Sequence, residues 1–146
     1  MHDPEILAFL HEHLDSVMHN DLEAYHATTS PDLTLYEWWV TPQRIDGLPF
    51  HDFMMEANAR RGSVFGAEGK PGGAVRLDLA NLHIQRYGEA AIASYTMLLS
   101  AETPAGVMVD AHNESRVMVK LDGRWQVVHV HKSPAYNAPH VPPSDH

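Results

Sequence analysis

Two basic residues in the C-terminal third of the sequence, Arg116 and Lys132, could together bind a negatively charged molecule. An arginine guanidinium forms two parallel hydrogen bonds with a carboxylate, and a lysine adds a compact positive charge. A carboxylate of the chain itself, Glu37 or Glu114, could instead pair with Arg116. These residues therefore predict either a site for an anion or an internal ion pair that holds a pocket wall.

Whether the two cations meet depends on the turn at Asp122 and Gly123. A two-residue loop would pair Lys132 with Asn113 and direct it away from Arg116, because side chains of a strand alternate between two faces. On that register no basic pocket forms.

A three-residue loop over residues 121–123, with the glycine in a left-handed bulge, places both cations on one face. Arg116 then pairs with Val128, and His112 pairs with Lys132. We expect this register, because it gathers apolar residues on the opposite face, where an exposed apolar surface would mark an interface. These residues are Val117, Val119, Trp125 and Val127.

Two histidines on the last predicted strand, His129 and His131, share one face at a spacing that can chelate zinc. A catalytic zinc site needs a third protein ligand, and His112 and Glu114 face the opposite way. The sequence contains no cysteine, which excludes disulfides and thiolate ligands. We therefore expect no metal and no cofactor.

Composition limits the possible functions. A length of 146 residues suits one domain, and the formal charge of −9 with dispersed basic residues excludes nucleic acid as a partner. No apolar run approaches the roughly 20 residues that cross a bilayer, and the acidic start does not look like a secretory signal. We expect a cytoplasmic protein without membrane contact. Several of the chain's twelve histidines lie in the first helix or the tail, His13 among them, and these are expected to be exposed.

Apolar residues at helical spacing predict a first helix over about residues 4–19. Asp21 can cap a second short helix that ends near His26. Pro49 suits the first turn of a third helix, which runs to about Arg61. His51 lies near the start of this helix, where it could face a cavity or bond to a backbone carbonyl.

The remaining segments read as strands and loops. Alternation predicts a strand at 33–37 and, after a loop at 62–73, four long strands joined by short turns. This order predicts an α+β fold with a cone-shaped, curved antiparallel sheet wrapped by three N-terminal helical segments. We expect one domain over residues 1–133 and an exposed tail over residues 134–146.

Several stretches of the sequence resemble the association (hub) domain of calcium/calmodulin-dependent protein kinase II, within the nuclear transport factor 2-like and SnoaL-like superfamily. The resemblance implies self-association into dimers and then rings, and a basic pocket that binds a small carboxylate. It is carried by Tyr36 and Glu37, by residues 44–53 (RIDGLPFHDF), 87–93 (YGEAAIA), 114–117 (ESRV) and 122–133 (DGRWQVVHVHKS).

The resemblance assigns His51, Arg116 and Lys132 to the pocket. Two family residues differ, since a pocket arginine falls on Thr96 and a mobile tryptophan falls on Ala59. A chain of 146 residues is too short to include a kinase domain. We therefore expect a stand-alone domain that self-associates and binds a small, anionic molecule.

Two enzymatic alternatives come from the same superfamily. Ketosteroid isomerase-like and SnoaL-like members use one carboxylate or histidine for proton abstraction, which makes Glu37, His51 and Asp52 candidates. Metal-free carbonic anhydrases that share the fold end with a similar His-x-Ser, here His131 and Ser133. Their first-strand threonine has no match in this sequence, where Trp38 and Trp39 follow Glu37. Side chains that could line the pocket and donate to an oxyanion are Tyr36, Tyr95 and Thr96.

Overall fold

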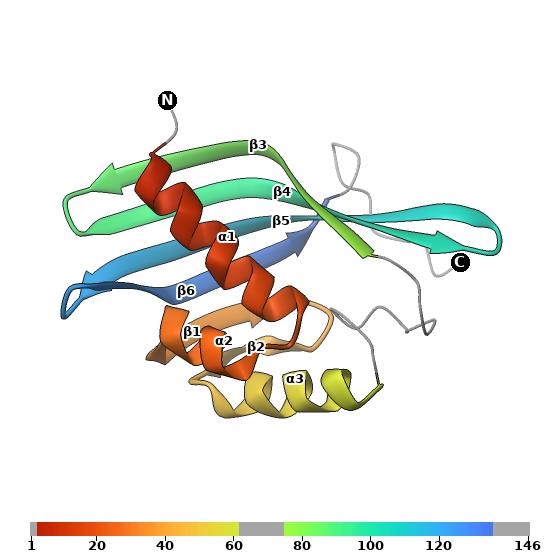
Figure 1. Cartoon of the computed structure of the whole chain (residues 1–146), viewed down its shortest axis with the longest axis horizontal. Helices are drawn as coiled ribbons and strands as arrows, with labels where there is room; N and C mark the ends of the chain where they lie inside the picture. The colour runs from red at the N-terminus through yellow and green to blue at the C-terminus, as the bar shows by residue number, and fades with distance from the viewer. Residues whose placement is uncertain (1–2, 62–74, 136–146) are drawn as a thin grey trace.

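The computed structural model describes residues 3–61 and 75–135, and it contains three helices and one six-stranded sheet (Figure 1). The loop predicted at 62–73 and the tail beyond residue 135 lie outside the described residues. The helices are α1 (Pro4–Met18), α2 (Leu22–Thr28) and α3 (Pro49–Arg61). The strands are β1 (Thr29–Glu37), β2 (Thr41–Asp46), β3 (Val75–Tyr87), β4 (Ala90–Thr103), β5 (Gly106–Leu121) and β6 (Arg124–Pro134).

The helices begin where the sequence predicts. The Asp3 carboxylate accepts hydrogen bonds from the first backbone N–H groups of α1, and Asp21 caps α2 in the same way. Ile6, Leu10 and Leu14 are buried, as their spacing on one helix face requires. Within residues 3–61 and 75–135, every helix is too short or too polar to span a membrane.

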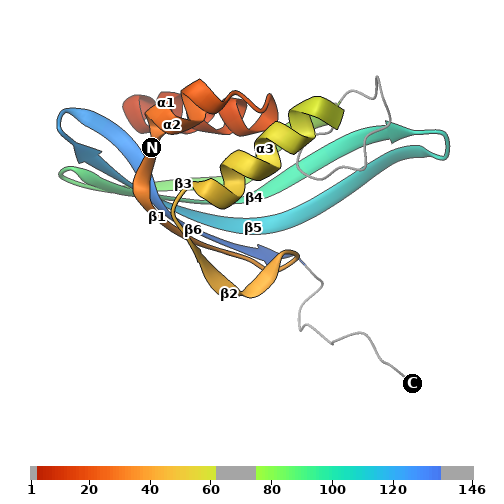
Figure 2. The same cartoon turned by 90° about the horizontal axis from the view of Figure 1, so that it is seen from below.

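The strands lie in the order β2-β1-β6-β5-β4-β3. All neighbours are antiparallel except β1 and β6, which are parallel. Strand β2 was not predicted, because its six residues are mostly exposed and lack an apolar alternation. Figure 2 shows the three helices on one side of a curved sheet, and the α+β cone predicted from the sequence is therefore confirmed.

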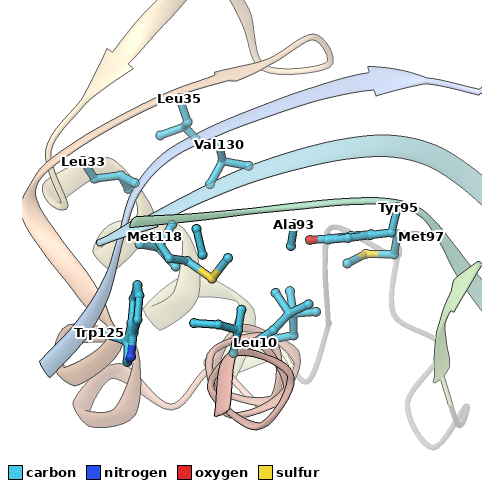
Figure 3. Packing of buried hydrophobic residues seen from close by; sticks show 13 residues of the cluster. Leu10, Leu33, Leu35, Ala93, Tyr95, Met97, Met118, Trp125 and Val130 are labelled. Atoms are coloured by element: carbon cyan, nitrogen blue, oxygen red, sulfur yellow. The ribbon is translucent and has the colours of Figure 1, made fainter. Parts of the chain in front are cut away.

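The core fills the space between α1 and the covered, inner face of the sheet. Alternate residues of β4 point into it, and Met118 of β5 joins them with no exposed surface. Figure 3 shows Leu10 of α1 close to Met118 and the ring of Trp125. The inward β4 residues are Ala91, Ala93, Tyr95 and Met97.

The turn of the last hairpin differs from the prediction. Asp122 and Gly123 form a two-residue turn with φ values of 50° and 80°, and Leu121 pairs with Arg124 across it. Positive φ at both central residues is the geometry that two-residue hairpins favour. The predicted three-residue loop is therefore wrong.

A bulge in β6 nevertheless brings the two cations to one face. Met118 pairs with Val127, whereas Val117 pairs with His129, so that Val128 is an extra residue in β6. One extra residue reverses the alternation of side chains beyond it.

The resulting partners differ from those expected, but the shared face is confirmed. Arg116 pairs with Val130, not with Val128, and Lys132 pairs with Glu114, not with His112. Both cations are buried on the inner face.

The same bulge corrects the prediction of an apolar outer face. Trp125 and Val127 precede the bulge and lie buried in the core, while Val117 and Val119 alone of the predicted set point outward. The middle of the outer face is polar instead. One row of paired residues crosses five strands there, and it consists of His83, Ser94, Ser115, His131 and Tyr36.

Candidate functional site

A row of four paired residues crosses the inner face of the sheet and carries most of its buried charge. Glu37 of β1 pairs with Lys132 of β6, Lys132 pairs with Glu114 of β5, and Glu114 pairs with Tyr95 of β4. Arg116 follows two positions after Glu114 on the same face. The exposed fractions of these five residues lie between 2% and 6%, so the cluster is shielded from water.

Glu114 is the centre of this cluster. Its Oε1 accepts hydrogen bonds from Arg116 Nη1 and from the Tyr95 hydroxyl, the latter at 2.6 Å. Its Oε2 lies 2.6 Å from His112 Nε2 and 3.9 Å from Lys132 Nζ. Burial alone would raise the pKa of Glu114, but Arg116 and Lys132 outweigh burial and lower it. The carboxylate is therefore ionised.

Glu37 connects the cluster to α3. Its Oε1 contacts His51 Nε2, and its Oε2 accepts a hydrogen bond of 3.1 Å from Lys132 Nζ. Burial acts to raise the pKa of Glu37, yet Lys132 and His51 lower it to about 2. The ionised Glu37 carboxylate accepts a hydrogen bond from the Nε2–H group of His51, and this bond fixes the orientation of the His51 ring.

Two polar atoms of the cluster are buried without a hydrogen-bond partner among the described residues: Arg116 Nε and His51 Nδ1. Arg116 loses hydration through burial, but Tyr95 and Glu114 stabilise its charge and raise its pKa. Arg116 Nη1 also donates to the Tyr95 hydroxyl at 2.6 Å. A buried donor without a partner costs about 1–3 kcal/mol, so a bound water or ligand would stabilise this arrangement.

Two small cavities adjoin these atoms. One, of about 40 Å³, reaches Arg116 and lies among α1, α2 and the sheet, and the other, of about 80 Å³, opens between α3 and Trp39. The same four residues line both cavities, so the two are neighbours. They are Val17, His51, Met55 and Lys132.

His13 of α1 also lines the inner cavity, which corrects its predicted exposure. Its side chain is buried and stacks on the Tyr25 ring, and its Nδ1 atom lies 2.9 Å from Thr28 Oγ1. Burial and the nearby charges of Arg116 and Lys132 hold the pKa of His13 well below its usual value. Its spacing from Ile6 and Leu10 puts it on the apolar helix face, and that pattern could have revealed its burial.

The structure removes three predicted residues from the pocket. Tyr36 and Thr96 point to the outer face, where Thr96 donates to Asn113 Oδ1 at 2.6 Å. Each follows an inward residue along its strand, so alternation sends it outward. Asp52 lies at the surface, 2.8 Å from His26 Nε2. Of the candidate acids and bases, only Glu37 and His51 meet.

The last strand's histidines also lie on the outer face. His129 Nδ1 is 2.8 Å from Thr34 Oγ1, and the His131 ring stacks obliquely on Tyr36. His112 and Glu114 are on the other side of the sheet, as predicted. In the described part of the chain, no three histidine or acidic side chains are grouped to hold a metal. Ser133, like His131, faces away from the cavities.

Comparison with known structures places the fold in the nuclear transport factor 2-like class. A nuclear transport factor 2-like protein of unknown function from Pseudomonas putida superposes with a TM-score of 0.71, covering 93% of this chain and 88% of that one at 17% identity. The hub homology domain of calcium/calmodulin-dependent protein kinase II from Chlamydomonas reinhardtii superposes with a TM-score of 0.75. It is 25% identical and covers 91% of this chain and 98% of that chain.

The family model described as the calcium/calmodulin dependent protein kinase II association domain matches residues 2–136. The chain therefore belongs to this family. The delta subunit of calcium/calmodulin-dependent protein kinase type II from Oryctolagus cuniculus is 28% identical over 141 residues, which are 95% of this chain. The chain spans only 25% of that relative's length.

Proposed function

We propose that the chain is a self-associating domain that binds a small carboxylate in the buried pocket formed by Arg116, Lys132 and His51. The observation that carries the pocket half of this proposal is the pair of unsatisfied buried atoms, Arg116 Nε and His51 Nδ1, beside two cavities. A carboxylate oxygen supplies the acceptor that Arg116 Nε lacks among the described residues.

The charge balance of the cluster limits what can bind. Glu37 and Glu114 already offset the charges of Lys132 and Arg116, so the internal ion pairs considered from the sequence are present. A bound anion therefore depends on the unpaired donor of Arg116 Nε and not on a net positive charge of the cluster.

Cavity size restricts the ligand to a small molecule. A site for one water takes about 10–15 Å³ of such space, so the two neighbouring cavities of about 40 and 80 Å³ together hold roughly eight to twelve heavy atoms. Short-chain monocarboxylates have four to six heavy atoms by their formulae, whereas a steroid is far larger. The pocket therefore fits a short acid.

Calorimetric titration with butyrate and with its neutral isostere butyramide tests the pocket. We expect butyrate to bind and butyramide not to bind, because only the carboxylate offers two charged acceptor oxygens. Arg116→Lys keeps a positive charge next to Glu114 but removes the planar guanidinium with its parallel N–H donors. This substitution should weaken butyrate binding about tenfold or more. Arg124→Lys, at an exposed position of the same hairpin, is the matched control. Equal affinity for butyrate and butyramide would exclude carboxylate recognition.

Self-association rests on family membership and on exposed apolar side chains near the tip of the β4–β5 hairpin. Val107, Met108 and Val109 are between 54% and 66% exposed there, more than a solitary domain usually leaves in one stretch. Light scattering at micromolar concentration should report a dimer or a larger ring. A measured mass of one chain would contradict self-association but would not affect the proposal of carboxylate binding.

One observation favours an enzyme as the second candidate function. The Glu37 contact with His51 Nε2 leaves the buried Nδ1 as a free base, an arrangement suited to proton abstraction from a small carbonyl compound. Acetone, incubated with the protein in D₂O and examined by NMR, would report this activity as deuterium at the methyl carbons next to the carbonyl group. If exchange is no faster with the protein than in buffer, the enzymatic function is excluded and only the binding function remains.

A further inference from the structure

A second, larger hollow lies outside the charged cluster, at the end of the sheet beyond α1. This cleft has a volume of about 360 Å³, within the range of about 300–1,000 Å³ that small-molecule sites occupy. Trp38 and Trp39, from the turn between β1 and β2, form one wall, and Asp110 and His112 of β5 contribute to another. Leu99 and Pro134 add apolar surface.

The aromatic wall has the geometry of a partial cage. The Trp38 and Trp39 rings are 4.5 Å apart between centroids and inclined at 79°. The His112 ring lies 5.6 Å from Trp38 and 6.0 Å from Trp39. The two tryptophans remain 42% and 47% exposed, so part of each indole is open to a ligand. Such exposure of two adjacent tryptophans is unusual for side chains that contribute only to packing.

The charges around the cleft favour a cation. Asp110 is exposed at its edge and forms no ion pair with any residue of the described ranges. The basic group nearest the tryptophans, Lys132, lies 5.2 Å from the centre of the Trp39 ring and is already paired with Glu37. This contact shows that the indole of Trp39 accepts a positive charge, as electron-rich rings do. The chain's formal charge of −9 adds an attractive field.

We propose that this cleft binds a small organic cation with a methylated ammonium head. The head would lie against Trp38 and Trp39, with Asp110 as its counter-charge. Methylated ammonium groups suit this site because they carry a diffuse charge, lose little hydration, and fill an apolar hollow. Trp39 also borders the outer of the two small cavities, but the proposal does not rest on carboxylate binding there.

Choline and its neutral carbon isostere, 3,3-dimethyl-1-butanol, provide the test, because they share one shape and differ in charge. Tryptophan fluorescence reports binding directly, since Trp38 and Trp39 are exposed while Trp125, the third tryptophan, is 7% exposed. At constant ionic strength, we expect choline to bind at least about fivefold more tightly than the isostere. Equal affinities would overturn the proposal and leave an apolar cleft without a preference for charge.

Three variants assign the signal to the cleft. Trp38→Leu should abolish the preference for choline, and Asp110→Asn should weaken choline binding about threefold to tenfold without changing that of the isostere. Asp122→Asn is the matched control, because it removes a carboxylate in the β5–β6 turn at a backbone position that asparagine tolerates. Undiminished choline binding in Asp110→Asn would contradict the role of Asp110. A signal that depends on protein concentration and not on choline would show a second copy in the cleft, which also overturns the proposal.

Discussion

Replacing Glu114 by alanine should lower the free energy of unfolding by about 3–5 kcal/mol, the usual cost of removing one partner of a buried ion pair. The substitution leaves Arg116 as a buried charge whose remaining acceptor in the cluster is the Tyr95 hydroxyl. It also removes the partner of His112 and one neighbour of Lys132. A domain of this size has about 5–15 kcal/mol of stability, so the loss is a large fraction of the total.

Urea denaturation followed by circular dichroism measures this effect. Glu102→Ala, which removes an exposed glutamate of β4, is the matched control and should change stability by less than about 0.5 kcal/mol. Combining Glu114→Ala with Arg116→Met removes both charges and should recover much of the loss, because no buried charge is then unpaired. A cost below about 1 kcal/mol for Glu114→Ala would show that water reaches Arg116 in solution.

The sequence was informative wherever one strong local pattern determined an element. The α1 periodicity and the Asp21 cap appear at the predicted places, and a turn does form at Asp122 and Gly123, although its loop has two residues and not three. These features depend on neighbouring residues, so they can be recognised without a partner strand. The fold class followed from these elements and from the family resemblance.

Register was the property that local patterns could not determine. The bulge at Val128 has no glycine or other distinctive residue, and it lies in a strand that pairs with β5 on one side and with β1 on the other. A single extra residue then moved Trp125 and Val127 from the predicted outer face to the core. The prediction that Arg116 and Lys132 share a face survived because the bulge in β6 had the same effect on alternation as the predicted bulge in the turn.

The partners of the buried charges were likewise beyond the sequence. From the sequence, Glu37 and Glu114 were both possible partners for Arg116. Only the strand order shows that Glu114 pairs with Arg116, whereas Glu37 pairs with Lys132 and His51. Trp38 and Trp39 gave no periodic signal, since they lie in a turn. Their role in the cleft depends on Asp110 and His112, which are about 70 residues away in the chain.

Lowering the pH from 7 to 5 should destabilise the domain by up to about 2 kcal/mol through His13 alone. In the folded state His13 is buried and neutral, because burial, Arg116 and Lys132 all oppose its protonation. In the unfolded chain the same histidine has a pKa near 6.5 and takes up a proton below that pH. The unfolded state therefore binds more protons, and the stability contributed by neutral His13 is present above pH 6.5 and lost as the pH falls.

The difference between wild type and His13→Gln isolates this contribution, since other histidines also titrate in this range. Glutamine can still hydrogen-bond to Thr28 but cannot become charged, so the variant should lose about 2 kcal/mol less than wild type between pH 7 and pH 5 in urea titrations. His11→Gln, on the exposed side of the same helix, should keep the wild-type slope. If His13→Gln and wild type were to lose stability in parallel, His13 would have to accept its proton within the folded domain, and the cavity beside Arg116 would then be accessible to water.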